Sequence, residues 1–208
     1  MARYTDPVCR ICRREGLKLF LKGSRCYSKK CSFERRSTPP GMNPTRRRKV
    51  SEFGLQMREK QRVRRSYSVL ERQFRNYFRN AERQRGMTGE NLLRLLEMRL
   101  DNVVFRMGFA SSRAQARQLV THGHFSINGR ATKSPGYQTS VGDRIEVRDT
   151  RRSRVFFQTA PDTMRAAQVP DWVSTDPSKL SGAILAQPSR EQMPMEFNEQ
   201  LVVEYYSR

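Results

Sequence analysis

One stretch, residues 99–147, constrains the fold more than any other part of this 208-residue chain. Ser112 can cap a helix, and Gln115 three residues later completes the capping-box pattern. Gly123 then occupies the position of a C-terminal helix cap. We expect this helix to carry a narrow apolar stripe of Ala114, Leu119 and Val120, and to point its polar residues elsewhere: Arg113, Gln115, Arg117 and Gln118.

Short strands should follow this helix. Residues 124–127 alternate as in a half-buried strand, and Asn128-Gly129 is a strong signal for a tight turn. Residues 144–147 alternate again and can pair nearby. An ordinary core with solvated arginines could produce the same helix and hairpin. The run of Arg, Gln and His on the polar face favours a contact with RNA instead.

The excess of positive charge limits the possible partners. The formal net charge is +21 and the isoelectric point is about 10.9, so a polyanion is expected. Residues 1–50 hold 15 Lys and Arg against 3 Asp and Glu, whereas residues 151–208 hold 7 against 7. The polyanion should therefore lie along the first two thirds of the chain. No apolar run approaches the roughly 20 residues of a membrane-spanning helix, and no signal segment opens the chain, so we expect a cytoplasmic protein.

The four cysteines, Cys9, Cys12, Cys26 and Cys31, all lie near the N-terminus. Two close pairs separated by a loop can place four thiolates around one tetrahedral Zn²⁺, and neighbouring arginines favour the thiolate form. The alternatives are an iron–sulfur cluster, free thiols, or two disulfides, which a cytosolic chain disfavours. We expect one structural zinc ion and no disulfide.

Residues 37–49 join this segment to the rest of the chain. Pro39-Pro40-Gly41 and Asn43-Pro44 block regular structure. The block Arg46-Arg47-Arg48-Lys49 can be a solvated linker, but the charge of the surrounding segment favours contact with phosphate.

Three helices should follow. Ser51 opens the first, with Phe53, Leu55, Met57 and Val63 as its apolar residues. Ser68 and Glu71 form a capping box for the second, whose stripe is Leu70, Phe74, Tyr77, Phe78 and Ala81. Thr88 opens the third, which is strongly apolar and should run continuously to Gly108.

The segment after Val147 changes character, because regularly spaced prolines keep its elements short. Trp172 and residues 183–185 should cover an apolar face. Asn198 can cap a last helix with Leu201, Val202 and Tyr205 on its stripe.

Residues SRAQARQLVTHGHFSINGR resemble the core of the S-four RNA-binding module. The whole chain resembles the bacterial small-subunit ribosomal protein family that gives this module its name. PVCRICRRE and RCYSKKCSFERR match the zinc-bearing form, LLRLLEMRLDNVVFRMGFA matches the helical domain, and MPMEFNEQLVVEYYSR matches the closing helix.

The resemblance implies a mainly α fold with small β elements (α+β). It implies an N-terminal four-cysteine zinc segment over residues 1–45, a helical domain over 46–98 plus 191–208, and an inserted helix–helix–strand RNA-binding module with short strands over 99–190. It also implies a structural constituent of the small ribosomal subunit that binds 16S rRNA, nucleates assembly of the subunit body and contributes to translational accuracy. Its further partners would be neighbouring ribosomal proteins and mRNA near the entry channel.

Folded RNA is recognised by its shape and phosphate positions more than by base edges, so the candidate contacts are spread along the chain. They are Arg46, Arg47, Arg48, Lys49, Arg58, Lys60, Arg62, Arg72, Arg75, Arg113, Gln115, Arg117, Gln118, His122, His124, Asn128 and Arg130. Of these, Arg113 and Arg117 lie four residues apart on one helix face and should be exposed. Their replacement by alanine should spare the fold and lower the salt dependence of RNA binding.

Two other classes of function compete with this interpretation. An RNA-modifying enzyme would need a catalytic domain, but residues 149–208 hold no P-loop, Gly-rich fingerprint or His/Cys/Asp cluster. A zinc-ribbon nucleic-acid-binding regulator would be expected to show repeated recognition helices, which are absent. We therefore expect neither catalytic residues nor a small-molecule substrate.

Overall fold

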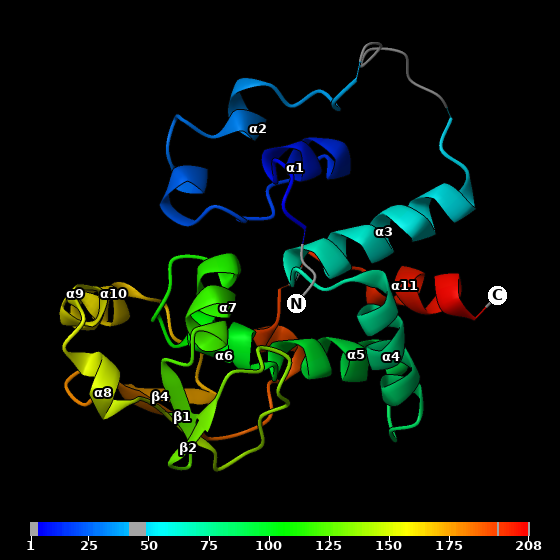
Figure 1. Ribbon diagram of the computed structural model, residues 1–208. Coiled ribbons are helices and arrows are strands. Elements are labelled where there is room, and N and C mark those ends of the chain that lie inside the picture. The colour runs from blue at the N-terminus through cyan, green and yellow to red at the C-terminus, as the bar shows by residue number, and fades with distance from the viewer. Residues whose placement is uncertain (1–3, 42–48, 195, 208) are drawn as a thin grey trace. The chain divides into compact units, whose positions relative to one another are not determined.

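The computed structural model describes residues 4–41, 49–194 and 196–207 (Figure 1). The chain divides into two compact units. The first combines Met1–Leu93 with Pro194–Arg208, and the second is Arg94–Met193. No helix among the described residues is long and apolar enough to cross a bilayer.

The first unit is helical. Its elements are α1 (Cys9–Glu15), the 3-10 helix η1 (Gly23–Tyr27), α2 (Ser32–Arg35), α3 (Glu52–Ser66), α4 (Glu71–Glu82), the start of α5 (Thr88–Glu97), and α11 (Glu199–Tyr206).

Local capping sets where two of these helices begin. The Ser51 hydroxyl accepts a hydrogen bond from the Gly54 N–H at 3.2 Å, and the Asn198 side chain accepts one from the Leu201 N–H at 3.4 Å. Both predicted caps are confirmed. The predicted capping box at Ser68 is wrong, because Ser68 has a φ of +53° and α4 begins after Leu70 without a side-chain cap.

The stripe of α4 forms the centre of this unit. Four of its five predicted residues are buried, namely Phe74, Tyr77, Phe78 and Ala81, whereas Leu70 is 39% exposed. Tyr206 of α11 packs against the ring of Phe78 with centroids 4.6 Å apart. Helices α4 and α11, which are distant in sequence, therefore contribute to one aromatic core.

Of the four apolar residues that the sequence indicates for helix α3, only Val63 is buried, and Met57 is half-buried. Phe53 and Leu55 are about half exposed, and the buried positions are mostly polar: Gln56, Glu59, Lys60, Val63 and Ser66. The physical reason is that α3 packs through ion pairs and hydrogen bonds with its neighbours, described below.

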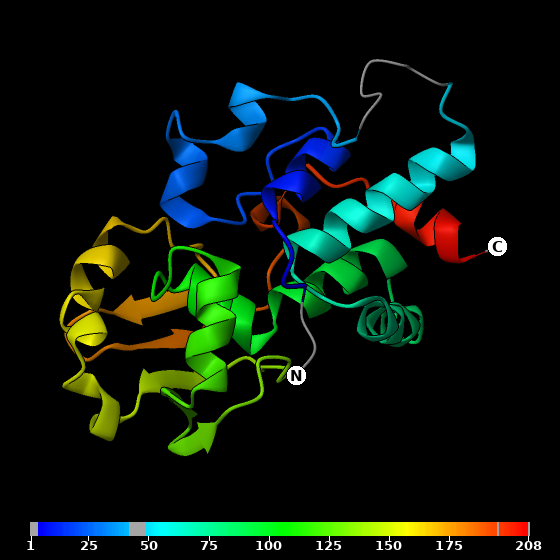
Figure 2. The same cartoon turned by 45° about the horizontal axis from the view of Figure 1, so that its top comes forward.

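The second unit contains a five-stranded antiparallel sheet in the order β2-β1-β3-β5-β4 (Figure 2). The strands are β1 (Phe125–Ile127), β2 (Arg130–Thr132), β3 (Arg144–Val147), β4 (Val173–Asp176) and β5 (Ser181–Ile184). Its helices are the end of α5, α6 (Leu100–Arg106), α7 (Arg113–Thr121), α8 (Asp149–Arg152), α9 (Val155–Gln158), α10 (Ala160–Ala166) and the 3-10 helix η2 (Arg190–Gln192). Mixed helix and antiparallel sheet confirm the predicted α+β class.

The predicted continuous helix from Thr88 to Gly108 is wrong, because the chain breaks between α5 and α6. Arg99 is extended, with φ −71° and ψ 138°, and forms an isolated bridge with Gln138. The Leu100 N–H donates to the Tyr137 carbonyl at 2.9 Å. Bonds to a distant loop therefore replace the helical bonds that would carry the helix through Arg99.

The stretch around α7 follows its prediction in part. The Ser112 hydroxyl accepts from the Gln115 N–H at 3.3 Å, but the Gln115 side chain accepts from Ser111, so only half of the capping box forms. Gly123 has a φ of +69°, as a C-terminal cap requires. Buried Ala116 and Val120 face the core, while Ala114 is exposed, which corrects the predicted stripe.

The hairpin after α7 has the predicted turn. Asn128 and Gly129 have φ values of +49° and +79° between the antiparallel β1 and β2. Strand β1 lies inside the sheet between β2 and β3, and it is buried along its whole length instead of alternating. The core beneath includes Trp172, Phe125, Phe157 and Ile184, so the predicted burial of Trp172 is confirmed.

Candidate nucleic-acid interface

The polar face of α7 is tied to the preceding helices by ion pairs. The Arg113 side chain is only 15% exposed; its Nε donates to Asn102 Oδ1 at 2.7 Å, and its Nη2 lies 3.8 Å from Glu97 Oε1. Fully buried Glu97 also accepts two hydrogen bonds from Arg106, at 2.9 Å each. Arg113 therefore does not project into solvent as its sequence position predicts.

Arg117 is held in the same way. Its Nη1 lies 3.1 Å from Asp101 Oδ2, and its side chain is also 15% exposed. Arg99 approaches the same Asp101 oxygen at 2.7 Å. The expectation that both α7 arginines are exposed is wrong, because buried carboxylates on α5 and α6 draw them inward. Their joint replacement by alanine would disturb the fold rather than spare it.

The remaining predicted contacts of this module differ in exposure. Gln118, His122, Asn128 and Arg130 are exposed and Gln115 is half-buried, while His124 is buried. Burial lowers the pKa of His124, and the positive charges of Arg154 and Arg151 lower it further. An accessible polar surface thus lies at the C-terminal end of α7 and along the β1–β2 turn.

Helix α4 presents an exposed row of arginines. Arg72, Arg75 and Arg79 line a shallow cavity of about 540 Å³ together with Glu71 and Asn76. Their spacing of three and four residues places them on one helix face, opposite the buried aromatic stripe. Arg72 and Arg75 were expected as contacts. Arg79 was missed, although the same helical spacing identifies it.

Several positively charged side chains of helix α3 form ion pairs or hydrogen bonds within the protein. Lys60 is 4% exposed; its Nζ lies 2.8 Å from Glu71 Oε1 and 4.4 Å from the centre of the Tyr205 ring. Burial raises the pKa of Glu71, but hydrogen bonds from Lys60 and Tyr206 outweigh this effect and hold the pKa below its usual value. The prediction of Lys60 as an RNA contact therefore does not fit its position, which joins α3, α4 and α11.

Glu15 at the end of α1 binds further arginines of α3. Its carboxylate forms ion pairs with Arg65 and, at 3.3 Å, with Arg58. Its backbone carbonyl accepts a hydrogen bond from Arg62 at 3.1 Å, and Arg62 also pairs with Glu59 at 2.8 Å. The Arg58 and Arg62 side chains remain 25% and 30% exposed, so each can both anchor α1 and reach a ligand. Lys49 is exposed, while Arg46, Arg47 and Arg48 lie outside the described residues.

One of the four cysteines, Cys12, belongs to the small apolar cluster around α1. Cys12, Cys26 and Cys31 are buried, Cys9 is half-buried, and all four thiols are free. Burial raises the pKa of Cys12, and the other three cysteines raise it further. The Lys22 N–H donates to Cys26 Sγ at 3.3 Å. Within the described ranges, no three His, Cys, Asp or Glu side chains form a group that could hold a metal ion.

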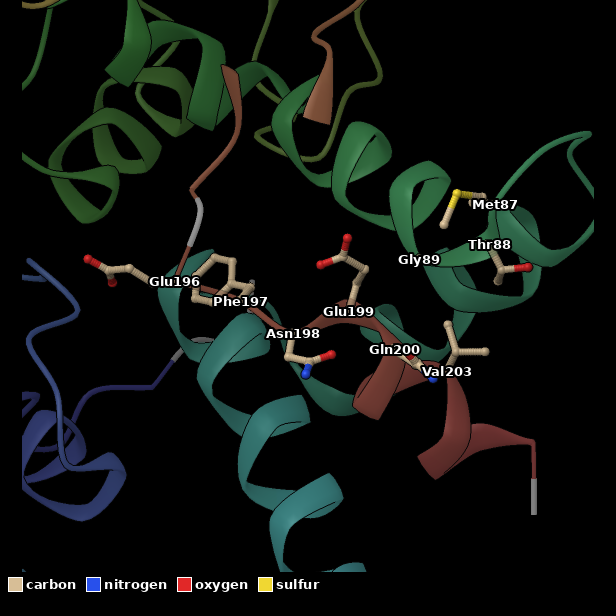
Figure 3. A pocket seen from close by; sticks show the side chains of 9 residues that line it. All are labelled: Met87, Thr88, Gly89, Glu196, Phe197, Asn198, Glu199, Gln200 and Val203. Carbon is tan, nitrogen blue, oxygen red and sulfur yellow. The ribbon is translucent and has the colours of Figure 1, made fainter. Parts of the chain in front are cut away.

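A second cavity, of about 680 Å³, has the opposite electrical character. It lies between the start of α5 and the segment leading into α11, and Figure 3 shows Glu196 and Glu199 among its lining residues with the apolar side chains Met87, Phe197 and Val203. Carboxylates repel phosphate, so this cavity is unsuited to RNA and contrasts with the basic row on α4.

We predict that Glu97→Ala will lower the free energy of unfolding by about 3–5 kcal/mol, because Arg106 and Arg113 would lose a fully buried carboxylate. Urea denaturation would measure the change. The matched control is Asp162→Ala, which removes an exposed ion pair with Arg165 and should change stability little. Equal effects of the two substitutions would contradict a structural role for the Glu97 network.

Comparisons with known proteins match the entire chain. Residues 3–97 match the sequence profile of the ribosomal protein S4/S9 N-terminal domain, and residues 98–145 match the S4 domain. The chain is 58% identical over 209 residues to the small ribosomal subunit protein uS4 of Syntrophomonas wolfei. It is 52% identical to uS4A of Alkaliphilus oremlandii and 53% identical to uS4 of Heliobacterium modesticaldum, each over 208 residues. Each alignment covers 100% of both chains. With identity of this extent along its full length, the chain belongs to the uS4 family of small ribosomal subunit proteins.

Proposed function

We propose that this chain is a structural constituent of the small ribosomal subunit that binds 16S rRNA directly. In this role it nucleates assembly of the subunit body and contributes to translational accuracy. The observation that carries the proposal is full-length identity of 52–58% to proteins named small ribosomal subunit protein uS4. The exposed arginine row of α4 supplies the chemistry that such a role requires.

The physical basis is the recognition of folded RNA through its phosphates. The deep, narrow major groove of an RNA helix hides the base edges, so a protein reads phosphate positions and overall shape. Arginine suits this task because its planar guanidinium donates two parallel hydrogen bonds to a phosphate. Arg72, Arg75 and Arg79 stand on a helix whose opposite face is buried in an aromatic core, so their spacing is fixed before the RNA arrives.

Family membership also bears on the other expectations. A uS4 protein is a structural component and not an enzyme, and its place is the cytoplasmic ribosome. Neighbouring small-subunit proteins are expected partners beside the rRNA. Contact with mRNA near the entry channel is a further part of the proposal, supported by the positive charge of the N-terminal third.

We further propose that Cys9, Cys12, Cys26 and Cys31 bind one structural Zn²⁺ ion. The donor set suits zinc, because four thiols in C-x2-C and C-x4-C pairs can supply its tetrahedral ligands. Cys9, Cys26 and Cys31 all act electrostatically on Cys12, which supports a site shared by the four sulfur atoms. The zinc would stabilise a segment whose apolar cluster is small, consisting of Ile11, Cys12 and Leu19 with a few half-buried neighbours.

We predict that Arg75→Gln combined with Arg79→Gln will lower the log–log salt slope of rRNA binding by roughly 1.4 to 1.8, since each phosphate contact adds about 0.7–0.9. The fold should be unchanged because both side chains are exposed. The slope is measured by titrating a 16S rRNA fragment at several salt concentrations. The control is Arg165→Gln with Lys179→Gln, which also removes two exposed cations but should leave the slope unchanged. Equal slopes for both double variants would count against an RNA contact at α4.

We predict that the protein will prefer a folded fragment of 16S rRNA to duplex DNA of the same length. The measurement is a gel-shift competition at physiological salt, where phosphate attraction alone favours neither ligand. A regulator of transcription would show the reverse preference. If both ligands compete equally, the protein binds nucleic acid only through non-specific charge attraction. This result would contradict the proposed function.

We predict about one zinc ion per chain in protein purified without chelator, as measured by elemental analysis. Cys9→Ser combined with Cys26→Ser should abolish zinc binding, because each cysteine pair would lose a ligand. Zinc that persists in this variant would place the metal elsewhere. An iron–sulfur absorption band in the wild-type protein would show that the cysteines hold an iron–sulfur cluster and not zinc.

A further inference from the structure

The segment after β3 is fixed against the turn between α7 and β1. The Arg148 N–H donates to the His124 carbonyl at 3.0 Å, and Arg148 Nη1 donates to the Gly123 carbonyl at 3.2 Å. The His124 ring lies edge-on to Phe157 of α9, with centroids 5.4 Å apart. Helix α8 accordingly lies near β1 (Figure 1). The chain that carries Arg151 and Arg154 therefore runs between two points fixed next to His124, namely Arg148 and Phe157.

Positive groups converge at this place. The charges of Arg154, Arg151 and His122 all act on His124, and the His122 and His124 rings are 6.1 Å apart. Among the described residues, no carboxylate lies within ion-pair distance of Arg151 or Arg154. The neighbouring Arg152 differs, because it pairs with Asp149 at 3.1 Å. Arg151 and Arg154 therefore carry charges that no described carboxylate balances at ion-pair distance.

Two buried nitrogen atoms of this cluster also lack partners. His124 is 6% exposed, and its Nδ1 has no hydrogen-bond partner in the described structure. The same is true of Arg151 Nε, which is shielded from solvent. A buried polar atom without a partner costs about 1–3 kcal/mol. A negatively charged ligand with acceptor oxygens can reach the exposed side chains of His122 and Arg154, and its charge would offset the repulsion between Arg151 and Arg154.

We propose that His122, His124, Arg151 and Arg154 form a binding site for one phosphate group of the RNA backbone. A phosphate fits because its oxygens accept hydrogen bonds from guanidinium and imidazole groups and its charge is negative. His122 and Arg154 are exposed, so a phosphate on an RNA chain can reach the site from solvent. The proposal rests on the proposed function and extends the RNA surface to residues 151 and 154, beyond the part of the chain where the net charge is concentrated.

The first test uses inorganic phosphate on the full-length protein, followed by the NMR signals of the histidine rings. Phosphate should shift the His122 and His124 signals and raise the pH midpoint of His124, since a bound anion favours the protonated ring. The shifts should disappear in the double variant Arg151→Gln with Arg154→Gln and persist in the control Arg152→Gln. No shift in the wild-type protein, or equal shifts in the double variant, would overturn the site.

The second test measures binding to a 16S rRNA fragment across salt concentrations. The double variant should lower the log–log slope by about 0.7 to 0.9, the value for one phosphate, while Arg152→Gln should leave it unchanged. Exposed Arg154→Gln alone should weaken binding in the same direction without disturbing the fold, which guards against misfolding of the double variant. An unchanged slope in both variants would overturn the assignment to RNA, even if free phosphate binds. Failure of the wild-type protein to bind the fragment would instead contradict the proposed function.

Discussion

The structure depends on a few acidic side chains that each form ion pairs with two basic side chains. With 41 Lys and Arg against 20 Asp and Glu, the folded chain must withstand strong self-repulsion. Glu15 binds Arg58 and Arg65, Glu97 binds Arg106 and Arg113, Asp101 binds Arg99 and Arg117, and Glu71 binds Lys60 and Arg64. Glu15, Glu97 and Asp101 are buried, where loss of one partner is most costly. The acids therefore join neighbouring helices in addition to the apolar contacts between them.

These pairings divide the arginines into two groups with different tasks. Arg113 and Arg117 hold α7 to the helices before it, although their place on a polar helix face makes them look like ligand contacts. Arg72, Arg75 and Arg79 stand on a helix whose buried face is aromatic, so α4 needs no ion pair from them to stay in place. The same residue type thus builds the scaffold at some positions and offers charge to a partner at others.

Sequence reasoning succeeded where the cause is local. Ser51 and Asn198 cap helices through bonds to residues three positions away, and the Asn128-Gly129 turn depends on backbone conformations that those residue types favour. Apart from the capping box at Ser68 and the half-formed one at Ser112, its main errors arose where a distant segment decides. The break at Arg99 depends on a loop almost forty residues later, and the burial of Arg113 depends on Glu97 of another helix. Neither partner can be identified from spacing within one helix.

The division of the arginines also limits how RNA can use this surface. Removing one partner from a buried ion pair costs about 3–5 kcal/mol, whereas a hydrogen bond to a charged group contributes about 1.5–3 kcal/mol. An arginine held by Glu97 or Asp101 would therefore lose more by leaving its carboxylate than one phosphate could return. The arginines that can bind RNA are accordingly those without a buried carboxylate as partner. The number of arginines in a segment does not identify the RNA surface. The cluster of Arg151 and Arg154 beside His124 fits this rule, because it is a place where cations meet without a carboxylate among the described residues.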